Sequence, residues 1–224
     1  MRRLWEALAR FWQRDESLSV LLGLLVFFEF VLPPLLPAER SGGVVKHVVF
    51  SLLLVAGATT VLRQGRWAVR TAAGLTLAAL PIRWASWAAP GDTVAAWSAA
   101  TAAVALALLA LVVVQMVLRP GTITSRRIEG AVAGYLLLAL AWSGAYECVA
   151  LLDPAAFAGS GAGGSRQWIY YSLVTLTTMG YGDITPVHPV ARSLATAEAL
   201  TGQMYIAILI SRLVALELQA REGR

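Results

Sequence analysis

The sequence predicts an all-α membrane protein with six transmembrane helices. Of its 224 residues, 58% are hydrophobic and only 14% are charged, whereas soluble domains contain about 25% charged residues. Several apolar runs reach about twenty residues, which is enough to cross a hydrocarbon core about 30 Å thick. The connections between these runs are alternately rich and poor in arginine, as in a multi-pass protein. These observations exclude an ordinary soluble domain.

Turn residues separate the six hydrophobic runs. Proline and glycine pairs favour turns over continued helix. They interrupt the apolar sequence at Pro33-Pro34, Gly42-Gly43, Pro90-Gly91 and Pro120-Gly121. A further apolar stretch near 166–178 is too short to cross a bilayer. The six expected spans are 18–36, 44–62, 68–89, 94–118, 129–152 and 189–214.

Arginine residues predict how the chain is oriented. They are concentrated before the first span, between the second and third, between the fourth and fifth, and after the sixth. Because cytoplasmic connections are enriched in Lys and Arg, both termini are expected in the cytoplasm. The expected location is the cell (plasma) membrane, with the long connection 153–188 outside. The arginines are Arg2, Arg3, Arg10, Arg14, Arg63, Arg66, Arg70, Arg119, Arg126, Arg127, Arg212, Arg221 and Arg224.

Composition also excludes other classes of function. The net charge of +5 comes from connections between apolar runs and not from one soluble face. We therefore expect membrane lipids as the surroundings and no nucleic-acid partner. His, Asp and Cys residues do not cluster at catalytic or metal-ligand spacing, so an enzyme is not expected. Cys148 lies in an apolar segment and is expected to be a small core residue.

Residues 1–17 have an amphipathic pattern of their own. Leu4, Leu8 and Phe11 recur at helical spacing, with Trp5 and Trp12 beside them, while arginines occupy the other side. Aromatic residues on one face and arginines on the other suit a helix that lies in the inner membrane interface. A cytoplasmic helix packed against a neighbouring subunit is the alternative.

The connection between the fifth and sixth expected spans contains the most specific motif. Residues 168–186 include Thr178-Met179-Gly180-Tyr181-Gly182-Asp183, preceded by a short apolar stretch of helical length. This segment closely resembles the pore domain of potassium channels. The resemblance covers about 129–218 and is only topological for the first four spans. It implies a re-entrant pore helix and selectivity filter between the fifth and sixth helices, in a homotetramer.

The residue types of the motif suit the binding of dehydrated K⁺. Four copies of such a loop supply rings of backbone carbonyls that replace the water shell of the ion. Aiming consecutive carbonyls at one axis needs alternating backbone handedness, which Gly180 and Gly182 permit. The resemblance implies K⁺ binding by carbonyls of Thr178, Met179, Gly180 and Tyr181, with the Thr178 hydroxyl as the innermost ring. K⁺ is the permeant ion, and no organic cofactor is expected.

Residues around the motif are assigned supporting roles by the same resemblance. Tyr181 is expected to point away from the axis, with Tyr171 as its aromatic neighbour. The Tyr170 hydroxyl is expected to hydrogen-bond Asp183, and Glu147 to cap backbone amides behind the filter. Val174 stands where some bacterial channels have a Glu, and Met179 where Val is more common. The expected supporting residues are Asp183, Tyr170, Tyr171, Thr177, Glu147 and Glu198.

The sixth expected span contains a glycine, a buried acid and an apolar stripe. Gly202 matches the hinge glycine of potassium channel inner helices, although a small residue for helix packing explains it equally well. Glu198 is costly in lipid, and we expect it to hydrogen-bond the base of the pore helix or a neighbouring subunit. The resemblance assigns a cavity and gate lining, for which an ordinary packing face is the alternative: Gln203, Ile206, Ile210, Val214 and Leu218.

The first four spans lack the residues of a conventional voltage sensor. No basic residue occurs in 94–118, and steep voltage gating needs several charges per subunit. About ten residues follow the sixth span, so no soluble ligand-binding domain is expected there. The expected parts are an interfacial helix (1–17), a four-helix sensor-like domain lacking gating arginines (18–118) and a pore domain (119–224).

The leading hypothesis is a potassium-selective channel subunit that conducts K⁺ passively through a tetrameric pore and is not conventionally voltage-gated. A non-conducting or regulatory membrane protein that retains a channel fold is one alternative. A transporter subunit with a relic of the filter, or a weakly selective cation channel, is another. The intact Tyr181 favours selectivity over the last of these.

Overall fold

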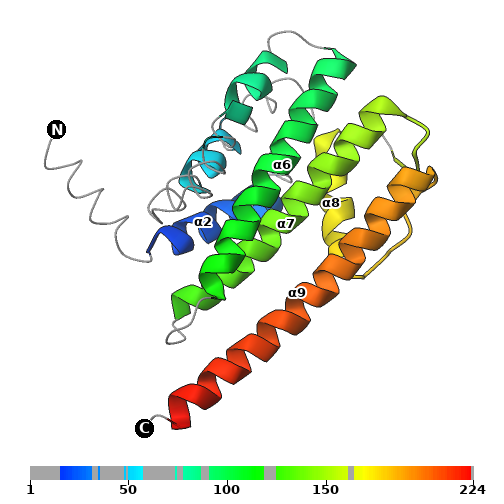
Figure 1. Ribbon diagram of the computed structural model, residues 1–224. Coiled ribbons are helices and arrows are strands. Elements are labelled where there is room, and N and C mark those ends of the chain that lie inside the picture. Colours follow the sequence, from blue (N-terminus) through cyan, green and yellow to red (C-terminus); the bar gives the residue numbers. More distant parts are fainter. Residues whose placement is uncertain are drawn as a thin grey trace, which may run out of the picture.

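The computed structural model describes residues 16–31, 35, 48, 50–57, 74, 78–86, 91–118, 125–160 and 164–222. Helices dominate these residues (Figure 1), and one very short strand lies before each of the last two helices. The labelled elements are α2 (Glu16–Val26), η1 (Phe27–Val31, a π-helix), α6 (Asp92–Val117), α7 (Ser125–Leu152), β1 (Phe157–Ala158), α8 (Ser165–Leu176), β2 (Thr185–Pro186) and α9 (Pro189–Glu222).

Within these described residues, three helices are long and apolar enough to cross a membrane. They are α6, residues Arg127–Leu152 of α7 and residues Pro189–Arg212 of α9. The fourth, fifth and sixth expected spans are therefore apolar helices of spanning length. The first three lie partly outside the described residues, although Ser19–Val31, 50–57 and 78–86 are helical within them. Residues 1–15 of the expected interfacial helix also lie outside the described residues.

Local sequence explains where α6 and α9 begin. Gly91 is the N-cap of α6 and follows Pro90 in the sequence, and Asp92 places a carboxylate in the first turn. A negative charge there interacts favourably with the helix dipole. α9 begins at Pro189, a residue whose fixed φ suits the first helical position. The His188 imidazole accepts a hydrogen bond from the Val190 N–H at 3.2 Å and so satisfies one free donor of the first turn.

Close contacts between small residues hold α6 against α7. Figure 1 shows the two helices side by side, with α2 packed across them. A Cβ atom added to Gly144 of α7 would lie 3.1 Å from the Ala103 side chain and 3.1 Å from the Ala99 carbonyl oxygen of α6. Membrane helices approach closely through such small residues, because van der Waals contacts drive their association.

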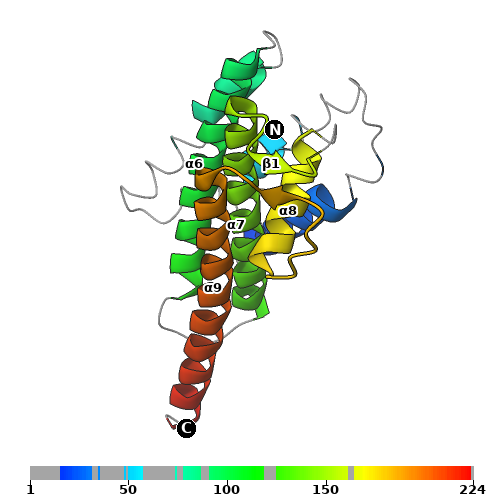
Figure 2. The same cartoon turned by 90° about the vertical axis from the view of Figure 1, so that its right-hand side faces the viewer.

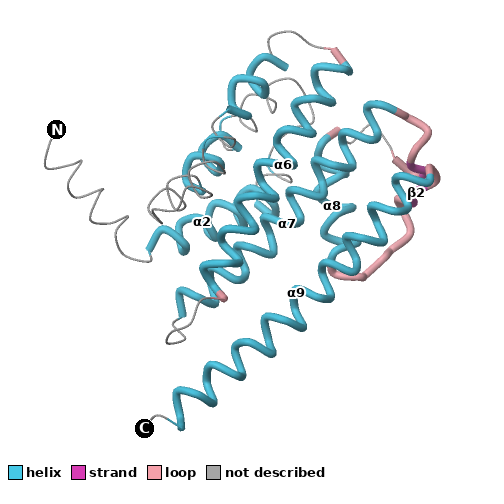
Figure 3. Tube along the Cα trace, in the orientation of Figure 1, coloured by secondary structure: helices cyan, strands magenta, loops and turns pink. Residues whose placement is uncertain are grey.

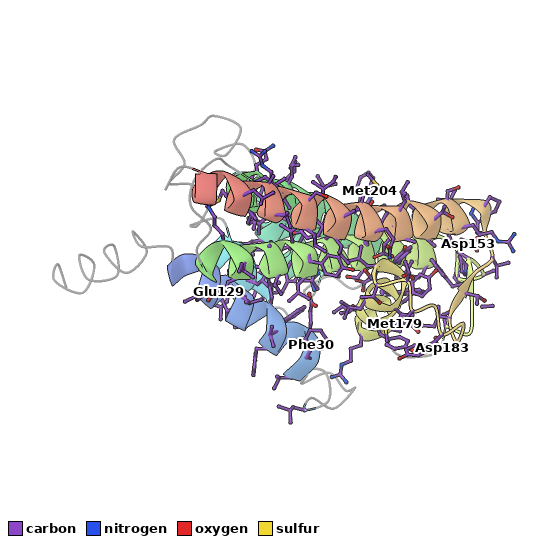
Figure 4. The ribbon with its side chains drawn as sticks, turned by 90° about the horizontal axis from the view of Figure 1, so that it is seen from below. Phe30, Glu129, Asp153, Met179, Asp183 and Met204 are labelled. Atoms are coloured by element: carbon purple, nitrogen blue, oxygen red, sulfur yellow. The ribbon has the colours of Figure 1, made fainter. Side chains whose placement is uncertain are left out.

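A leucine-rich core joins α2 to the α6–α7 pair. Leu21 and Leu25 of α2 are buried together with Leu106 and Leu109 of α6 and Leu137 of α7. At one end of this interface the Ser19 hydroxyl donates to the Glu129 carboxylate near the start of α7. Figure 4 shows Glu129 at this end of α7, beside α2. α2 thus packs against α7, the helix that precedes the filter motif.

α8 lies between α7 and α9 and is followed by the irregular segment that contains the filter motif. Figures 2 and 3 show α8 beside α7, with the connection from α8 to α9 forming an open loop that ends in β2. β1 and β2 form an antiparallel pair in which Phe157 faces Pro186 and Ala158 faces Thr185. This pair ties the segment before α8 to the segment after the motif.

α9 is the least covered of the three long helices. Only 11% of its spanning window is buried, against 50% for α6 and 39% for α7. Its C-terminal half extends away from the other helices (Figure 1). The single chain therefore leaves a long apolar helix without protein neighbours along much of its length.

Candidate functional site

The backbone of the filter motif has positive φ at every second residue. Thr178 has φ 59°, Gly180 has φ 57° and Gly182 has φ 78°. The two glycines behave as predicted, since they have no Cβ that penalises this conformation. Thr178 adopts a positive φ although it has a Cβ. The sequence did not indicate this conformation. Alternation of this kind breaks the β-strand pattern, in which successive carbonyls point to opposite sides.

The C-terminal turn of α8 fixes the inner half of the motif. The Val174 carbonyl accepts the N–H of Met179 at 2.9 Å and that of Gly180 at 3.2 Å. The Thr177 hydroxyl, from one of the predicted supporting residues, donates to the Leu173 carbonyl at 2.6 Å. The last carbonyls of a helix have no intrahelical partner and form the negative end of its dipole. The start of the motif therefore lies where a cation is favoured.

The outer end of the motif is held by Tyr170 and by the β1 region. The Tyr170 hydroxyl hydrogen-bonds the Asp183 carboxylate, as predicted, and this bond raises the pKa of Tyr170 above its ordinary value. A Cβ added to Gly159 would lie 1.9 Å from the Asp183 carbonyl oxygen. The backbone after β1 thus passes directly against Asp183, an approach that only glycine permits. Figure 4 shows Met179 and Asp183 on this segment beside α8.

The predicted contact between Tyr171 and Tyr181 is absent from the ring contacts of the described residues. Tyr171 is buried, with its ring 4.8 Å from that of Tyr146 and 5.6 Å from that of Phe157. Tyr181 is 64% exposed. The reason is the rotation of α8: its face with Trp168 and Tyr171 packs towards α7, while Tyr170 points to the filter side. Consecutive helical residues cannot share a face.

Glu198 of α9 reaches α8, as the sequence analysis predicted. Its carboxylate oxygen Oε1 lies 2.5 Å from Oγ of Ser172 in α8, and Oε2 accepts a hydrogen bond from the Tyr146 hydroxyl of α7 at 2.5 Å. The carboxyl group is completely buried. Three helices are thus joined at one buried acid.

Glu147 contacts the start of α8. Its Oε1 accepts a hydrogen bond from the Ser165 hydroxyl at 2.5 Å, and Ser165 is the first residue of α8. The expectation that Glu147 caps backbone amides behind the filter remains a prediction. A carboxylate at this end interacts favourably with the positive end of the helix dipole.

Gly202 packs against the end of α8. A Cβ added to Gly202 would lie 2.1 Å from the Leu176 carbonyl oxygen. That oxygen also accepts a hydrogen bond from the Tyr135 hydroxyl at 3.1 Å. α9 continues as an α-helix through this position, so the structure supports the packing alternative, while the hinge remains a prediction.

The predicted cavity-lining residues lie along α9 and include one contact with the motif. Nε2 of Gln203 donates to Oγ1 of Thr178 at 3.1 Å, which places Gln203 beside the inner end of the motif. Ile206, Ile210, Val214 and Leu218 are exposed on the single chain, but Leu200 and Met204 on other sides of α9 are exposed as well. Figure 4 shows Met204 on the side of α9 away from α8. Exposure alone thus does not assign the lining.

Sequence reasoning missed three residues of this site. Ser172 and Tyr146 hold the Glu198 carboxyl, and Gly159 permits the approach to Asp183. Ser172 is polar within an otherwise apolar stretch, which is a signal that sequence alone contains. Tyr146 and Gly159 become recognisable only once the neighbouring elements are placed.

Two apolar helices of spanning length, α7 and α9, thus enclose a short helix and a filter-like segment. Residues 161–218 match the family described as Ion channel. This part of the chain is therefore similar to ion channels.

Individual relatives share only short segments with the chain. It is 41% identical over 54 residues to two pore potassium channel c of Oryza sativa subsp. japonica, covering 24% of the chain and 12% of the relative. Identity to protein LctB is 39% over 62 residues for Geobacillus stearothermophilus and 46% over 46 residues for Bacillus caldotenax. These cover 28% and 20% of the chain, and 46% and 34% of the relatives. The chain thus spans less than half the length of each relative. No solved structure matches it significantly.

Proposed function

We propose that four copies of the chain form a potassium-selective pore that conducts K⁺ passively across the cell membrane. The observation that carries this proposal is the alternating positive φ at Thr178, Gly180 and Gly182, within the segment that matches the ion channel family. Such alternation turns consecutive carbonyls towards one side of the strand, where four copies replace the hydration shell of an ion. The filter would consist of Thr178, Met179, Gly180, Tyr181 and Gly182.

The surroundings of the motif favour a cation. The carbonyl end of α8 lies at the inner end of the motif, and the negative end of a helix dipole attracts positive charge. One relative that is 41% identical over 54 residues is described as a potassium channel. The hydroxyl of Thr178 lies beside Gln203 of α9, so a polar ring would separate the filter from the apolar residues below it.

Exposure of the motif on the single chain supports assembly into a tetramer. Met179 is 60% exposed and Tyr181 is 64% exposed. Irregular backbone at membrane depth is tolerated only where protein packs against it or where it lines a water-filled path, so the exposed filter segment would need neighbouring subunits. The poorly covered helix α9 has the same requirement. A fourfold arrangement would cover both.

The full topology follows the arginine pattern. We propose six spans with both termini in the cytoplasm, α8 re-entering the membrane from outside, and the division into 1–17, 18–118 and 119–224. α6 contains no arginine or lysine, so its passage through the field would move no basic charge. Because steep voltage gating requires several such charges per subunit, the pore would not be conventionally voltage-gated.

Ion flux into vesicles that contain the purified protein tests this function. We expect uptake of K⁺ that barium blocks and that Na⁺ does not replace. A Na⁺ flux equal to the K⁺ flux would contradict selectivity. A pure tetramer that passes neither ion would instead favour a non-conducting protein that retains a channel fold.

A further inference from the structure

Three completely buried polar side chains from three helices meet behind the filter. Glu198 of α9, Ser172 of α8 and Tyr146 of α7 are each 0% exposed. The Tyr146 hydroxyl donates to Oε2 of Glu198 at 2.5 Å, and Oγ of Ser172 lies 2.5 Å from Oε1. The same Oγ lies 2.7 Å from the carbonyl oxygen of Ala139 in α7. Polar groups buried this completely are almost always hydrogen-bonded in native proteins.

The number of available protons determines the ionisation state of Glu198. A serine hydroxyl has one proton, and a backbone carbonyl can only accept. With Glu198 ionised, the Ser172 hydroxyl would face two acceptors with one proton, so one short O···O contact would lack a hydrogen. With Glu198 protonated, its Oε1–H donates to Ser172, and Ser172 donates to the Ala139 carbonyl. Each contact then contains one hydrogen.

The titratable groups around Glu198 also favour its protonated state. The titratable groups that interact with the Glu198 carboxyl are Tyr135 and Tyr146 from α7 and Tyr171 from α8. Among the described residues no basic side chain is part of this group. An ionised carboxylate would therefore be a buried charge without a counter-ion, which is far more costly than a buried neutral acid with its hydrogen bonds satisfied.

We propose that Glu198 is a proton-dependent positioning residue: its protonated carboxyl ties α9 to the pore helix α8, and release of its proton lowers conduction. This inference rests on the proposed function. When the proton leaves for solvent, Glu198 changes from donor to acceptor towards Ser172. The single proton of Ser172 must then serve either the carboxylate or the Ala139 carbonyl, and the other acceptor loses its hydrogen.

Ser172 and Glu198 lie close to the residues that hold the filter segment. Ser172 lies two residues before Val174, and the Val174 carbonyl accepts the N–H groups of Met179 and Gly180. One turn further along α9, Gly202 rests on the carbonyl of Leu176, the last residue of α8. A displacement of α8 relative to α9 at Ser172 would therefore move the carbonyl that holds the filter backbone.

The pH dependence of K⁺ flux tests the proposal, with vesicles prepared at pH values from about 6 to about 10, a range that lies above ordinary carboxyl titration and reaches ordinary phenol titration. In Glu198→Gln, the amide N–H can donate to Ser172 and the amide carbonyl can accept from Tyr146, but the group does not titrate. Glu129→Gln is the matched control, because Glu129 lies near the other end of α7 beside Ser19. We expect the original chain and Glu129→Gln to lose most of their flux at the alkaline end.

The Glu198→Gln protein is expected to conduct with a flat pH profile. An alkaline loss of flux that persists in Glu198→Gln would overturn the proposal, as would a flat profile in the original chain. Absence of K⁺ flux from all three proteins at every pH would instead contradict the proposed function.

Infrared spectroscopy provides a readout that does not need conduction. The original chain and Glu129→Gln, in detergent at neutral pH, are expected to show the C=O stretch of a protonated carboxyl. This band is expected to be weaker in Glu198→Gln, in which the buried Glu29 is the remaining candidate. A band of equal intensity in Glu198→Gln and the original chain, or no band in any of the three proteins, would show that Glu198 does not hold the proton.

Discussion

Thr178 has a positive φ although its side chain penalises that conformation. The left-handed region costs an L-residue roughly 1–2 kcal/mol, and threonine is stiff as well because it is β-branched. Two hydrogen bonds hold it there: its N–H donates to the Thr175 carbonyl at 2.9 Å, and its hydroxyl accepts from Gln203 at 3.1 Å. Strained backbone of this kind persists where the surroundings over-determine it. The backbone conformation of Thr178 is therefore determined by its contacts with α8 and α9 and not by the intrinsic preference of threonine.

Gly202→Ala is predicted to destabilise the pore domain. The added Cβ would lie 2.1 Å from the Leu176 carbonyl oxygen, which is backbone and cannot rotate away. Overpacking of this kind costs about 1–3 kcal/mol. The midpoint of thermal unfolding in detergent is expected to fall.

Gly23→Ala is the matched control for this change. An added Cβ at Gly23 in α2 meets nothing within 4 Å, and alanine is the better helix former by about 1 kcal/mol. Its unfolding midpoint is expected to stay level or rise. Equal midpoints for Gly202→Ala and Gly23→Ala would show that α9 and α8 do not depend on this contact.

At the scale of single elements, α8 is held at both of its ends. Glu147 accepts from Ser165 at its start, and the Leu176 carbonyl at its end contacts Gly202 and the Tyr135 hydroxyl. Tyr171 packs its middle against Tyr146. A twelve-residue helix is marginal on its own, so these contacts give α8 its fixed position. That position in turn places the filter segment, which has no regular structure of its own.

The β1–β2 pair holds the outer end of the filter, and Gly159→Ala is predicted to disturb it. The added Cβ would lie 1.9 Å from the Asp183 carbonyl oxygen, in addition to the strain of φ 76°. We expect a lower ratio of K⁺ to Na⁺ flux, since Asp183 directly follows the filter.

Gly164→Ala is the control that separates the effect of a Cβ at positive φ from the effect of the close contact between residue 159 and Asp183. Gly164 also has a positive φ, of 56°, but an added Cβ meets nothing within 4 Å. Both variants place a Cβ on a residue with positive φ, and only Gly159→Ala adds the contact with Asp183. An equal flux ratio for both variants would contradict a role of this contact in selectivity.

At the scale of the whole molecule, the proposed pore requires more than one chain. One filter segment cannot surround an ion, and α9 leaves most of its apolar surface uncovered. The bundle of α2, α6 and α7, in contrast, has a buried leucine core of its own. Assembly would therefore take place through the pore domain, with the earlier helices outside it.

The mass of the purified protein in detergent tests this assembly. A tetramer has about four times the chain mass of 23.9 kDa, as native mass spectrometry can measure. We expect that species to predominate, because Tyr181 and α9 gain protein neighbours only in the assembly. A monomer that conducts K⁺ selectively would contradict the proposed architecture.

Much of the pore domain could be predicted from the sequence, because the responsible signals are local. Apolar runs of spanning length identified the helices that became α6, α7 and α9. Gly180 and Gly182 indicated positive φ, which both residues have. The Tyr170–Asp183 hydrogen bond followed from the resemblance to potassium channels.

The partners of several side chains could not be predicted, because they depend on how neighbouring helices are rotated. Spacing along α8 did not reveal that Tyr171 faces Tyr146 and leaves Tyr181 exposed. The hydrogen bond between Glu147 and the start of α8 was likewise not predicted.

The amino-acid sequence by itself determined that this is a helical membrane protein with a filter-like motif. Hydrophobic length and backbone freedom are properties of consecutive residues, so no tertiary information is needed to read them. Only the tertiary structure decided which groups hold that motif: the Val174 carbonyl, the Gly202–Leu176 contact and the buried Glu198 carboxyl. The Gly202–Leu176 and Glu198–Ser172 contacts join residues far apart in the chain, and their distances are set by the packing of α8 against α9.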